Sequence, residues 1–129
     1  MTAKKRILII DDEEDLRKML KFRMEALGYE VDEAVDGAEG LDKARRNSSD
    51  LIIMDLMLPK IDGFKLCRML KFDEKYKHMP IIMFTARAQK EDMQLGMEMG
   101  ADAYITKPFE PAVLLAKIKE LLELKIETC

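Results

Sequence analysis

The sequence predicts a doubly wound α/β domain, in which a five-stranded parallel sheet is covered by five helices. Short apolar runs alternate with longer segments of helical periodicity along the whole chain. Runs such as ILII and LIIM are apolar at every position, which is typical of parallel strands that are buried on both faces. The length of 129 residues fits one such domain.

The expected strands are short and apolar, and helical segments follow each of them. The strands are predicted at 6–10, 30–34, 51–54, 81–84 and 103–105, and the helices at 14–27, 38–46, 64–72, 89–99 and 111–125. In the first helix, apolar residues recur at a helical spacing, which predicts one buried face made of Leu16, Leu20, Met24 and Leu27. We expect one domain over 1–129, with its core at about 5–125.

Composition and charge argue against several classes of protein. The 22 Lys and Arg residues against 25 Asp and Glu give a net charge of -3, which offers no broad attraction to nucleic acid or an anionic membrane. No apolar stretch approaches the length of a membrane span or of a signal peptide. Cys67 and Cys129 form neither a metal-ligand spacing nor a disulfide framework. We expect a cytoplasmic protein with no direct nucleic-acid or membrane partner.

Polar residues of unusual kinds follow four of the strands. Asp11 and Asp12 follow the first strand, Asp55 the third, Thr85 the fourth and Lys107 the fifth. Ligands of such sheets bind outside the carboxyl ends of the strands, so these side chains are expected to converge. Carboxylates that converge either retain protons or share a bound cation. Because the candidate ligands are all oxygen atoms, Mg²⁺ fits best.

The same residues provide the parts that phosphoryl transfer needs. Asp55 is a candidate nucleophile that would form an aspartyl phosphate, while Lys107 supplies positive charge and Thr85 a hydroxyl donor. Each residue alone has an ordinary explanation, since Asp12 is placed to cap the first helix and Tyr104 could be a half-buried packing aromatic. The combination at matching strand ends favours a functional site.

Four segments, IIDDEED, IIMDLMLPKIDGF, IIMFTA and GADAYITKPF, resemble in order the signature segments of response-regulator receiver domains. The resemblance covers nearly the whole chain. It implies a flavodoxin-like, CheY-like sheet in the order 2-1-3-4-5. It also implies a two-component signalling switch rather than an enzyme, one that catalyses only its own phosphoryl transfer and dephosphorylation.

The resemblance assigns a role to each site residue. Asp55 would accept a phosphoryl group from a sensor histidine kinase or a phosphotransfer protein, in a reaction that depends on Mg²⁺. The metal ligands would be Asp12, Asp55 and the carbonyl of Met57, with Asp11 acting through a water molecule.

Further roles surround the phosphoryl group. The residues expected to contact or support it are Lys107, Thr85, the amide of Ala86, Arg87, and Pro108 after a cis bond. Tyr104 would be the aromatic switch residue. Met57 and Arg87 lie two residues past Asp55 and Thr85, where fast-hydrolysing chemotaxis members have polar residues, so Met57 predicts slower self-dephosphorylation.

The output is expected to pass through the face formed by 89–99, 103–105 and 111–122, because Tyr104 belongs to it. Met57, FTAR and GADAYITKPF also resemble receivers of the winged-helix transcription-factor subfamily, which pair through their last helical face. Those members usually have two consecutive acids where this chain has Asp102 and Ala103, so a phosphorylation-dependent homodimer is left open.

Two other functions fit part of this pattern. A magnesium-dependent phosphohydrolase of the haloacid-dehalogenase kind also forms an aspartyl phosphate, but its Asp-x-Asp signature follows the first strand. Here Asp11 and Asp12 are adjacent, and the candidate nucleophile Asp55 follows the third strand. A phosphorylation-independent interaction module would need no complete set of acids, hydroxyl and lysine.

Overall fold

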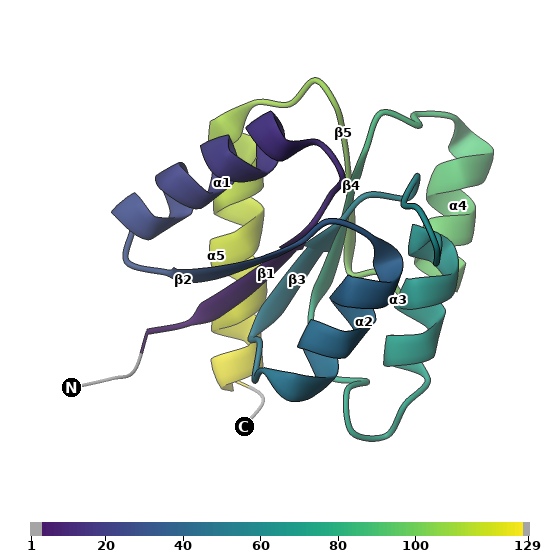
Figure 1. The fold of residues 1–129 in the computed structure, drawn as a ribbon, viewed down its shortest axis with the longest axis horizontal. Helices are drawn as coiled ribbons and strands as arrows, with labels where there is room; N and C mark the ends of the chain where they lie inside the picture. The colour runs from purple at the N-terminus through teal and green to yellow at the C-terminus, as the bar shows by residue number, and fades with distance from the viewer. Residues whose placement is uncertain (1–3, 128–129) are drawn as a thin grey trace.

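The computed structural model describes residues 4–127, with side chains through residue 123. Its strands are β1 (Arg6–Ile10), β2 (Glu30–Ala34), β3 (Leu51–Met54), β4 (Ile81–Thr85) and β5 (Ala103–Thr106). Its helices are α1 (Glu14–Ala26), α2 (Gly37–Arg46), α3 (Gly63–Lys71), α4 (Lys90–Glu98) and α5 (Pro111–Glu127). The strands form one parallel sheet in the order β2-β1-β3-β4-β5, so the expected fold and strand order are confirmed (Figure 1).

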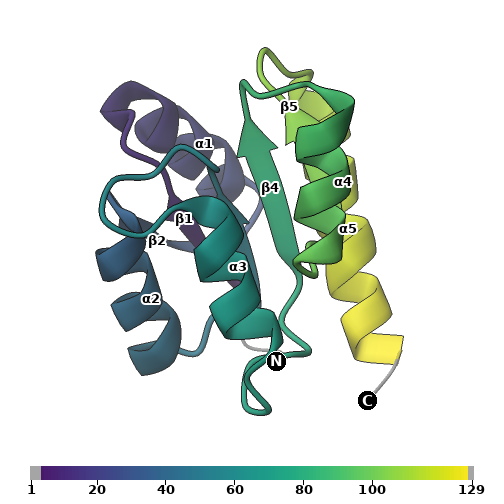
Figure 2. The same cartoon turned by 90° about the vertical axis from the view of Figure 1, so that its right-hand side faces the viewer.

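Helices cover both faces of the sheet, with α1 and α5 on one side and α2, α3 and α4 on the other (Figures 1 and 2). Side chains of β1 alternate between these two layers. Ile7 and Ile9 pack with α1 and α5, whereas Leu8 and Ile10 pack with α2 and α3. All four are at most 1% exposed, which explains why the strand is apolar from Ile7 to Ile10.

One predicted core position of α1 is wrong. Leu27 is 59% exposed, because the helix ends at Ala26 and Leu27 is the residue that follows its last turn. Gly28, at φ +95, then redirects the chain toward β2. The buried face of α1 consists instead of Leu20, Met24 and the side chain of Arg17.

The two cysteines differ in what can be said of them. Cys67 is fully buried in the layer between the sheet and α3, and burial raises the pKa of its thiol to about 12. It is therefore a core residue. Cys129 lies outside the described residues. Within the described part of the chain, no helix combines the length and apolar character of a membrane span.

Candidate functional site

Three carboxylates meet at the carboxyl ends of β1 and β3. The two strands are paired in register up to Ile10 and Met54, and the next residues are Asp11 and Asp55. The Asp55 amide donates to the Ile10 carbonyl at 3.1 Å, which places the two acids side by side. Oxygen atoms of Asp11, Asp12 and Asp55 all lie within 4.8 Å of one another. The predicted convergence of these three acids is confirmed.

Lys107 extends into this cluster from the loop after β5. Its Nζ donates to Asp11 Oδ2 at 2.9 Å, to Asp55 Oδ2 at 3.0 Å and to Glu13 Oε1 at 3.1 Å. It also lies 5.3 Å from the centre of the Phe84 ring. One ammonium group therefore donates hydrogen bonds to three carboxylates.

The electrostatics of the cluster are unbalanced toward negative charge. Burial raises the pKa of Asp11 above its ordinary value, and the nearby charge of Asp55 adds to this, while the Glu13 amide and Lys107 act against it. Burial would lower the pKa of Lys107, but its hydrogen bonds to Asp11 and Asp55 outweigh burial and raise it. Lys107 is thus charged at neutral pH, yet it balances only one of the surrounding carboxylates.

The donor set of the cluster fits a hard divalent cation. Every candidate ligand side chain from Asp11, Asp12 and Asp55 offers carboxylate oxygen, and Asp12 is exposed to solvent. Such oxygen sets, open to water on one side, suit Mg²⁺. The Met57 amide donates to Asp55 Oδ1 at 3.1 Å, so Met57 is adjacent to the cluster, while its side chain is 62% exposed.

Asp12 does not cap the first helix. The residue at the N-cap of α1 is Glu13, and among the described contacts no side chain accepts a capping hydrogen bond there. The Glu13 amide donates instead to Asp11 Oδ1 at 2.9 Å. The capping explanation considered for Asp12 is therefore wrong, because the helix begins at Glu14 and its N-cap position is one residue beyond Asp12.

Thr85, Arg87 and Tyr104 form a second group beside the acid cluster. Thr85 is fully buried at the end of β4, and its Oγ1 accepts from the Arg87 amide at 3.3 Å. The Tyr104 hydroxyl donates to the Arg87 carbonyl at 2.6 Å, and its ring lies against Gly96 of α4. The described hydrogen bonds of Thr85 and Tyr104 thus lead to the loop after β4 rather than to Asp55.

Two expected residues flank these groups without a side-chain contact to the acids. Ala86 is exposed in the loop after β4. The Lys107–Pro108 bond is cis, as the resemblance implied, and Pro108 is exposed. The guanidinium of Arg87 pairs with Asp92 at 2.6 Å and so links this loop to α4.

Sequence reasoning missed two neighbours of the cluster. Glu13 adds a further carboxylate on Lys107, and its signal was the uninterrupted acid run DDEED. Gly63 begins α3 directly against Asp55, where a Cβ would lie 2.4 Å from the Asp55 carbonyl oxygen. Only glycine fits so close a backbone approach. Its signal was the DGF triplet, which alone resembles any turn.

Comparison with known proteins decides the family. Residues 7–119 match the response regulator receiver domain. The chain belongs to this family. It is 44% identical to the alkaline phosphatase synthesis transcriptional regulatory protein PhoP of Bacillus subtilis, over 92% of this chain and 48% of that protein. It is 44% identical to the DNA-binding dual master transcriptional regulator RpaA of Synechocystis, over 91% of this chain and 48% of that protein.

The receiver therefore spans about half the length of these curated relatives. Both relatives are named as transcriptional regulators, which agrees with the resemblance to receivers of the winged-helix subfamily. Among solved structures, the CheY-like receiver domain protein of Methanospirillum hungatei superimposes with a TM-score of 0.92 and 36% identity, over 98% of this chain and 100% of that one. The chain is thus a receiver domain of two-component signalling.

Proposed function

We propose that this receiver is switched by phosphorylation of Asp55 in a reaction that depends on Mg²⁺, with a sensor histidine kinase or a phosphotransfer protein as donor. The observation that carries this proposal is the shared lysine: Lys107 Nζ lies 3.0 Å from Asp55 Oδ2 and 2.9 Å from Asp11 Oδ2. A nucleophile, a fixed positive charge and a carboxylate cation site are the parts of a phosphoryl-transfer centre.

The residues of the cluster divide the chemistry among them. An oxygen of Asp55 would form the new bond to phosphorus while the bond from phosphorus to the donor atom breaks. Lys107 is already charged and donates to Asp55, so it would contact the oxygens of the phosphoryl group on Asp55. Mg²⁺, bound by Asp11, Asp12, Asp55 and the Met57 carbonyl, would balance the negative charge that the three phosphoryl oxygens carry.

The group around Arg87 supports a conformational response. Thr85 Oγ1 accepts from the Arg87 amide, so a displacement of Thr85 toward a phosphoryl oxygen would act directly on Arg87. Tyr104 is bound to the same residue through the Arg87 carbonyl. A movement of Thr85 would therefore loosen the loop from Ala86 onward and free Tyr104 to change position.

The surfaces around the site suit protein partners. An apolar hollow of about 350 Å³ opens beside Lys107 and is lined in part by Leu16, Met19 and Phe109, which would serve a phosphoryl donor protein. On the proposed output face of 89–99, 103–105 and 111–122, exposed apolar side chains come from Met93, Leu95, Met97 and Val113. We propose that this face binds an effector or a second copy after phosphorylation.

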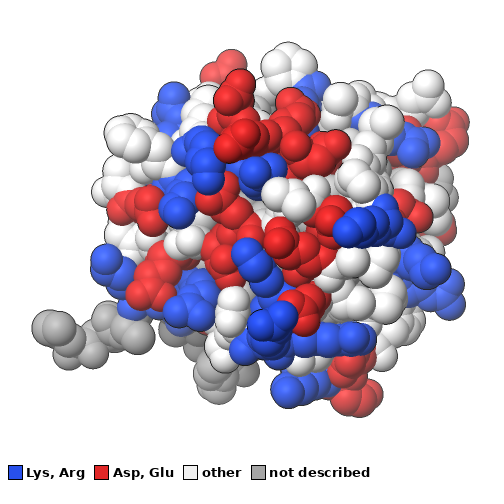
Figure 3. Space-filling model, in the orientation of Figure 1, with Lys and Arg blue, Asp and Glu red and all other residues white. Residues whose placement is uncertain are grey.

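Surface charge and Met57 bear on where the protein acts and on how long it keeps its phosphoryl group. Acidic and basic side chains are interspersed on the face shown in Figure 3, which gives no one-sided field for a polyanion. We infer a cytoplasmic signalling protein that turns over only its own phosphoryl group. The exposed thioether of Met57 neither donates nor accepts usefully, so we infer slow self-dephosphorylation.

Treatment with acetyl phosphate and Mg²⁺ tests the proposal. The intact mass of the wild-type chain should rise by one phosphoryl group, and neither the Asp55→Asn variant nor wild type in EDTA should change. Asp50→Asn serves as a matched control, since Asp50 precedes the amino end of β3, whereas Asp55 follows its carboxyl end. A wild-type chain that no small donor or histidine kinase labels would refute the proposal.

A further inference from the structure

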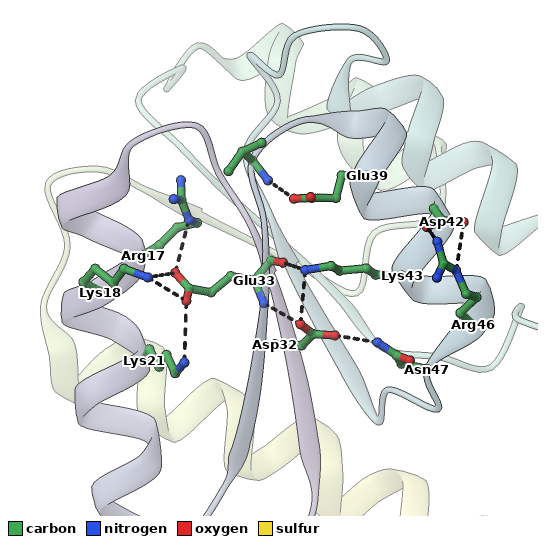
Figure 4. Close-up of polar contacts among 11 residues, drawn as sticks. Arg17, Lys18, Lys21, Asp32, Glu33, Glu39, Asp42, Lys43, Arg46 and Asn47 are labelled. Atoms are coloured by element: carbon green, nitrogen blue, oxygen red, sulfur yellow. Dashed lines mark hydrogen bonds and ion pairs between the residues drawn. The ribbon is translucent and has the colours of Figure 1, made fainter.

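A buried arginine connects the acid cluster with the edge of the sheet. Arg17 lies on α1 and is only 7% exposed, although arginine is rarely buried unless it is paired. Its Nη1 donates to the backbone carbonyl of Asp11 at 2.6 Å, and its Nε donates to Glu33 Oε1 on β2 at 3.2 Å. Figure 4 shows Arg17 reaching Glu33 from the α1 side of the strand. The two donors of one planar guanidinium thus join two elements.

The backbone of Asp11 is held at both its amide and its carbonyl. Its amide donates to the Ala34 carbonyl at 3.1 Å, which continues the pairing of β1 with β2. Its carbonyl lies before the first turn of α1, whose earliest described backbone bond runs from Arg17 to the Glu13 carbonyl. A buried carbonyl needs a partner, and Arg17 supplies it. This carbonyl belongs to the peptide group between Asp11 and Asp12, so its orientation also sets the position of Asp12.

Glu33 is in turn held by several cations. Besides Arg17, Lys18 Nζ lies 3.0 Å and Lys21 Nζ 3.7 Å from its carboxylate (Figure 4). Burial alone would raise the pKa of Glu33, but Lys18, Arg17 and Lys21 outweigh it and lower the pKa. Glu33 therefore remains ionised at neutral pH and anchors the guanidinium.

We propose that Arg17 is a positioning residue for the acid cluster: through the Asp11 carbonyl it fixes the turn between β1 and α1, so that the carboxylates of Asp11 and Asp12 face Asp55. Glu33 anchors Arg17 in this position. The consequence for Mg²⁺ binding rests on the proposed function, whereas the fixed turn is a property of the chain alone. Outer hydrogen-bond partners of ligand residues typically change metal affinity by about 10- to 100-fold.

The chain offers a matched control for this role. Lys18 pairs with the same carboxylate of Glu33, but its described contacts do not include the Asp11 turn. Arg17→Met and Lys18→Met therefore remove the same charge from the same partner, and only the first releases Asp11. Arg17→Lys retains the charge but lacks the planar pair of donors, so it separates geometry from charge.

Two measurements on these variants test the proposal. Without metal, hydrogen exchange of the Asp11 and Glu13 amides should be several-fold faster in Arg17→Met and Arg17→Lys than in wild type or Lys18→Met, measured relative to Ile52 and Ile53 in the core. With Mg²⁺, calorimetric titration should show an affinity lower by about tenfold for both Arg17 variants and within about twofold of wild type for Lys18→Met.

The outcomes separate the two proposals. Unchanged exchange in the turn of the Arg17 variants, or full recovery in Arg17→Lys, would overturn the positioning role. Faster exchange with unchanged Mg²⁺ affinity would also overturn it, since Arg17 would then only stabilise the fold. If wild type bound no Mg²⁺, the proposed function would fail while the exchange result still decided whether Arg17 fixes the turn. Should Arg17→Met not fold, Glu33→Gln must give the same changes in the same direction.

Discussion

Two charge clusters of this receiver have the same composition with the signs of the charges exchanged. In one, a single lysine, Lys107, contacts the carboxylates of Asp11, Glu13 and Asp55. In the other, a single carboxylate, Glu33, contacts the cations of Arg17, Lys18 and Lys21. The first lies at the carboxyl ends of the central strands, whereas the second lies along the edge strand β2.

The two clusters differ in the direction in which the pKa of their carboxylate shifts. Burial raises the pKa of Asp11 despite Lys107, so its ionised form is disfavoured in the fold. Burial acts in the same direction on Glu33, but the surrounding cations reverse it, so its ionised form is favoured. A cluster that retains uncompensated negative charge can bind a cation, while a compensated cluster stabilises the fold.

The largest expected contrast comes from removing one acid from the Lys107 cluster. Asp11→Asn should lower Mg²⁺ affinity by at least about tenfold in a calorimetric titration. In EDTA at neutral pH, the free energy of unfolding should not fall, because the lost charge is one that the fold disfavours, and the amide oxygen can still accept from Glu13. A large loss of stability in EDTA would show that the charge excess is structural.

Removing the acid of the other cluster should have the opposite effect. Glu33→Gln leaves the buried Arg17 without its charged partner, so the free energy of unfolding should fall by about 1–2 kcal/mol. Urea unfolding of wild type and variant at neutral pH measures this loss. A variant as stable as wild type would mean that the cations around Glu33 contribute nothing, and the contrast between the clusters would disappear.

The stability supplied by Glu33 should depend on pH. Its pKa is lower in the folded state than in the unfolded state, so the contribution is present above the unfolded value and is lost as the pH falls through the folded value. The difference in urea midpoint between wild type and Glu33→Gln should therefore shrink from about pH 6 to about pH 3. A difference that stays constant over this range would point to packing instead of charge.

The smallest expected effect concerns an exposed cation. The side chain of Lys18 is 57% exposed, so its pair with Glu33 is screened by solvent. Lys18→Met should change the free energy of unfolding by less than about 1 kcal/mol. If thermal or urea unfolding shows a loss equal to that of Glu33→Gln, the stabilisation would come from the exposed lysines and not from buried Arg17.

The sequence predicted the acid cluster because topology alone places it. The carboxyl ends of parallel strands lie on the same side of the sheet, so Asp11, Asp55 and Lys107 meet once the strands and their order are assigned. The strand order came from the family resemblance and the strands themselves from apolar runs. Periodicity could not place the end of α1 within a residue, and this is why Leu27 was assigned to the core.

The Glu33 cluster could not be predicted in the same way. Arg17 lies three and seven residues before Leu20 and Met24, so helical spacing places it on their face of α1. An arginine at such a position is normally expected to extend its charged end to solvent, so nothing in the sequence signals that the guanidinium is buried. Its partners lie six and sixteen residues away on other elements. The hydrogen bond from the Arg87 amide to Thr85 could not be predicted from the sequence either, because the orientation of a hydroxyl depends on the loop that follows it.

Chemical trapping at Asp55 tests the central claim most directly. Borohydride reduces an aspartyl phosphate to homoserine, and peptide mapping locates the reduced residue. After treatment with acetyl phosphate and Mg²⁺, we predict homoserine at position 55 alone, and unmodified aspartate throughout when EDTA replaces Mg²⁺. Homoserine at position 11 or 12, or none at any position of a folded wild-type chain, would contradict the account.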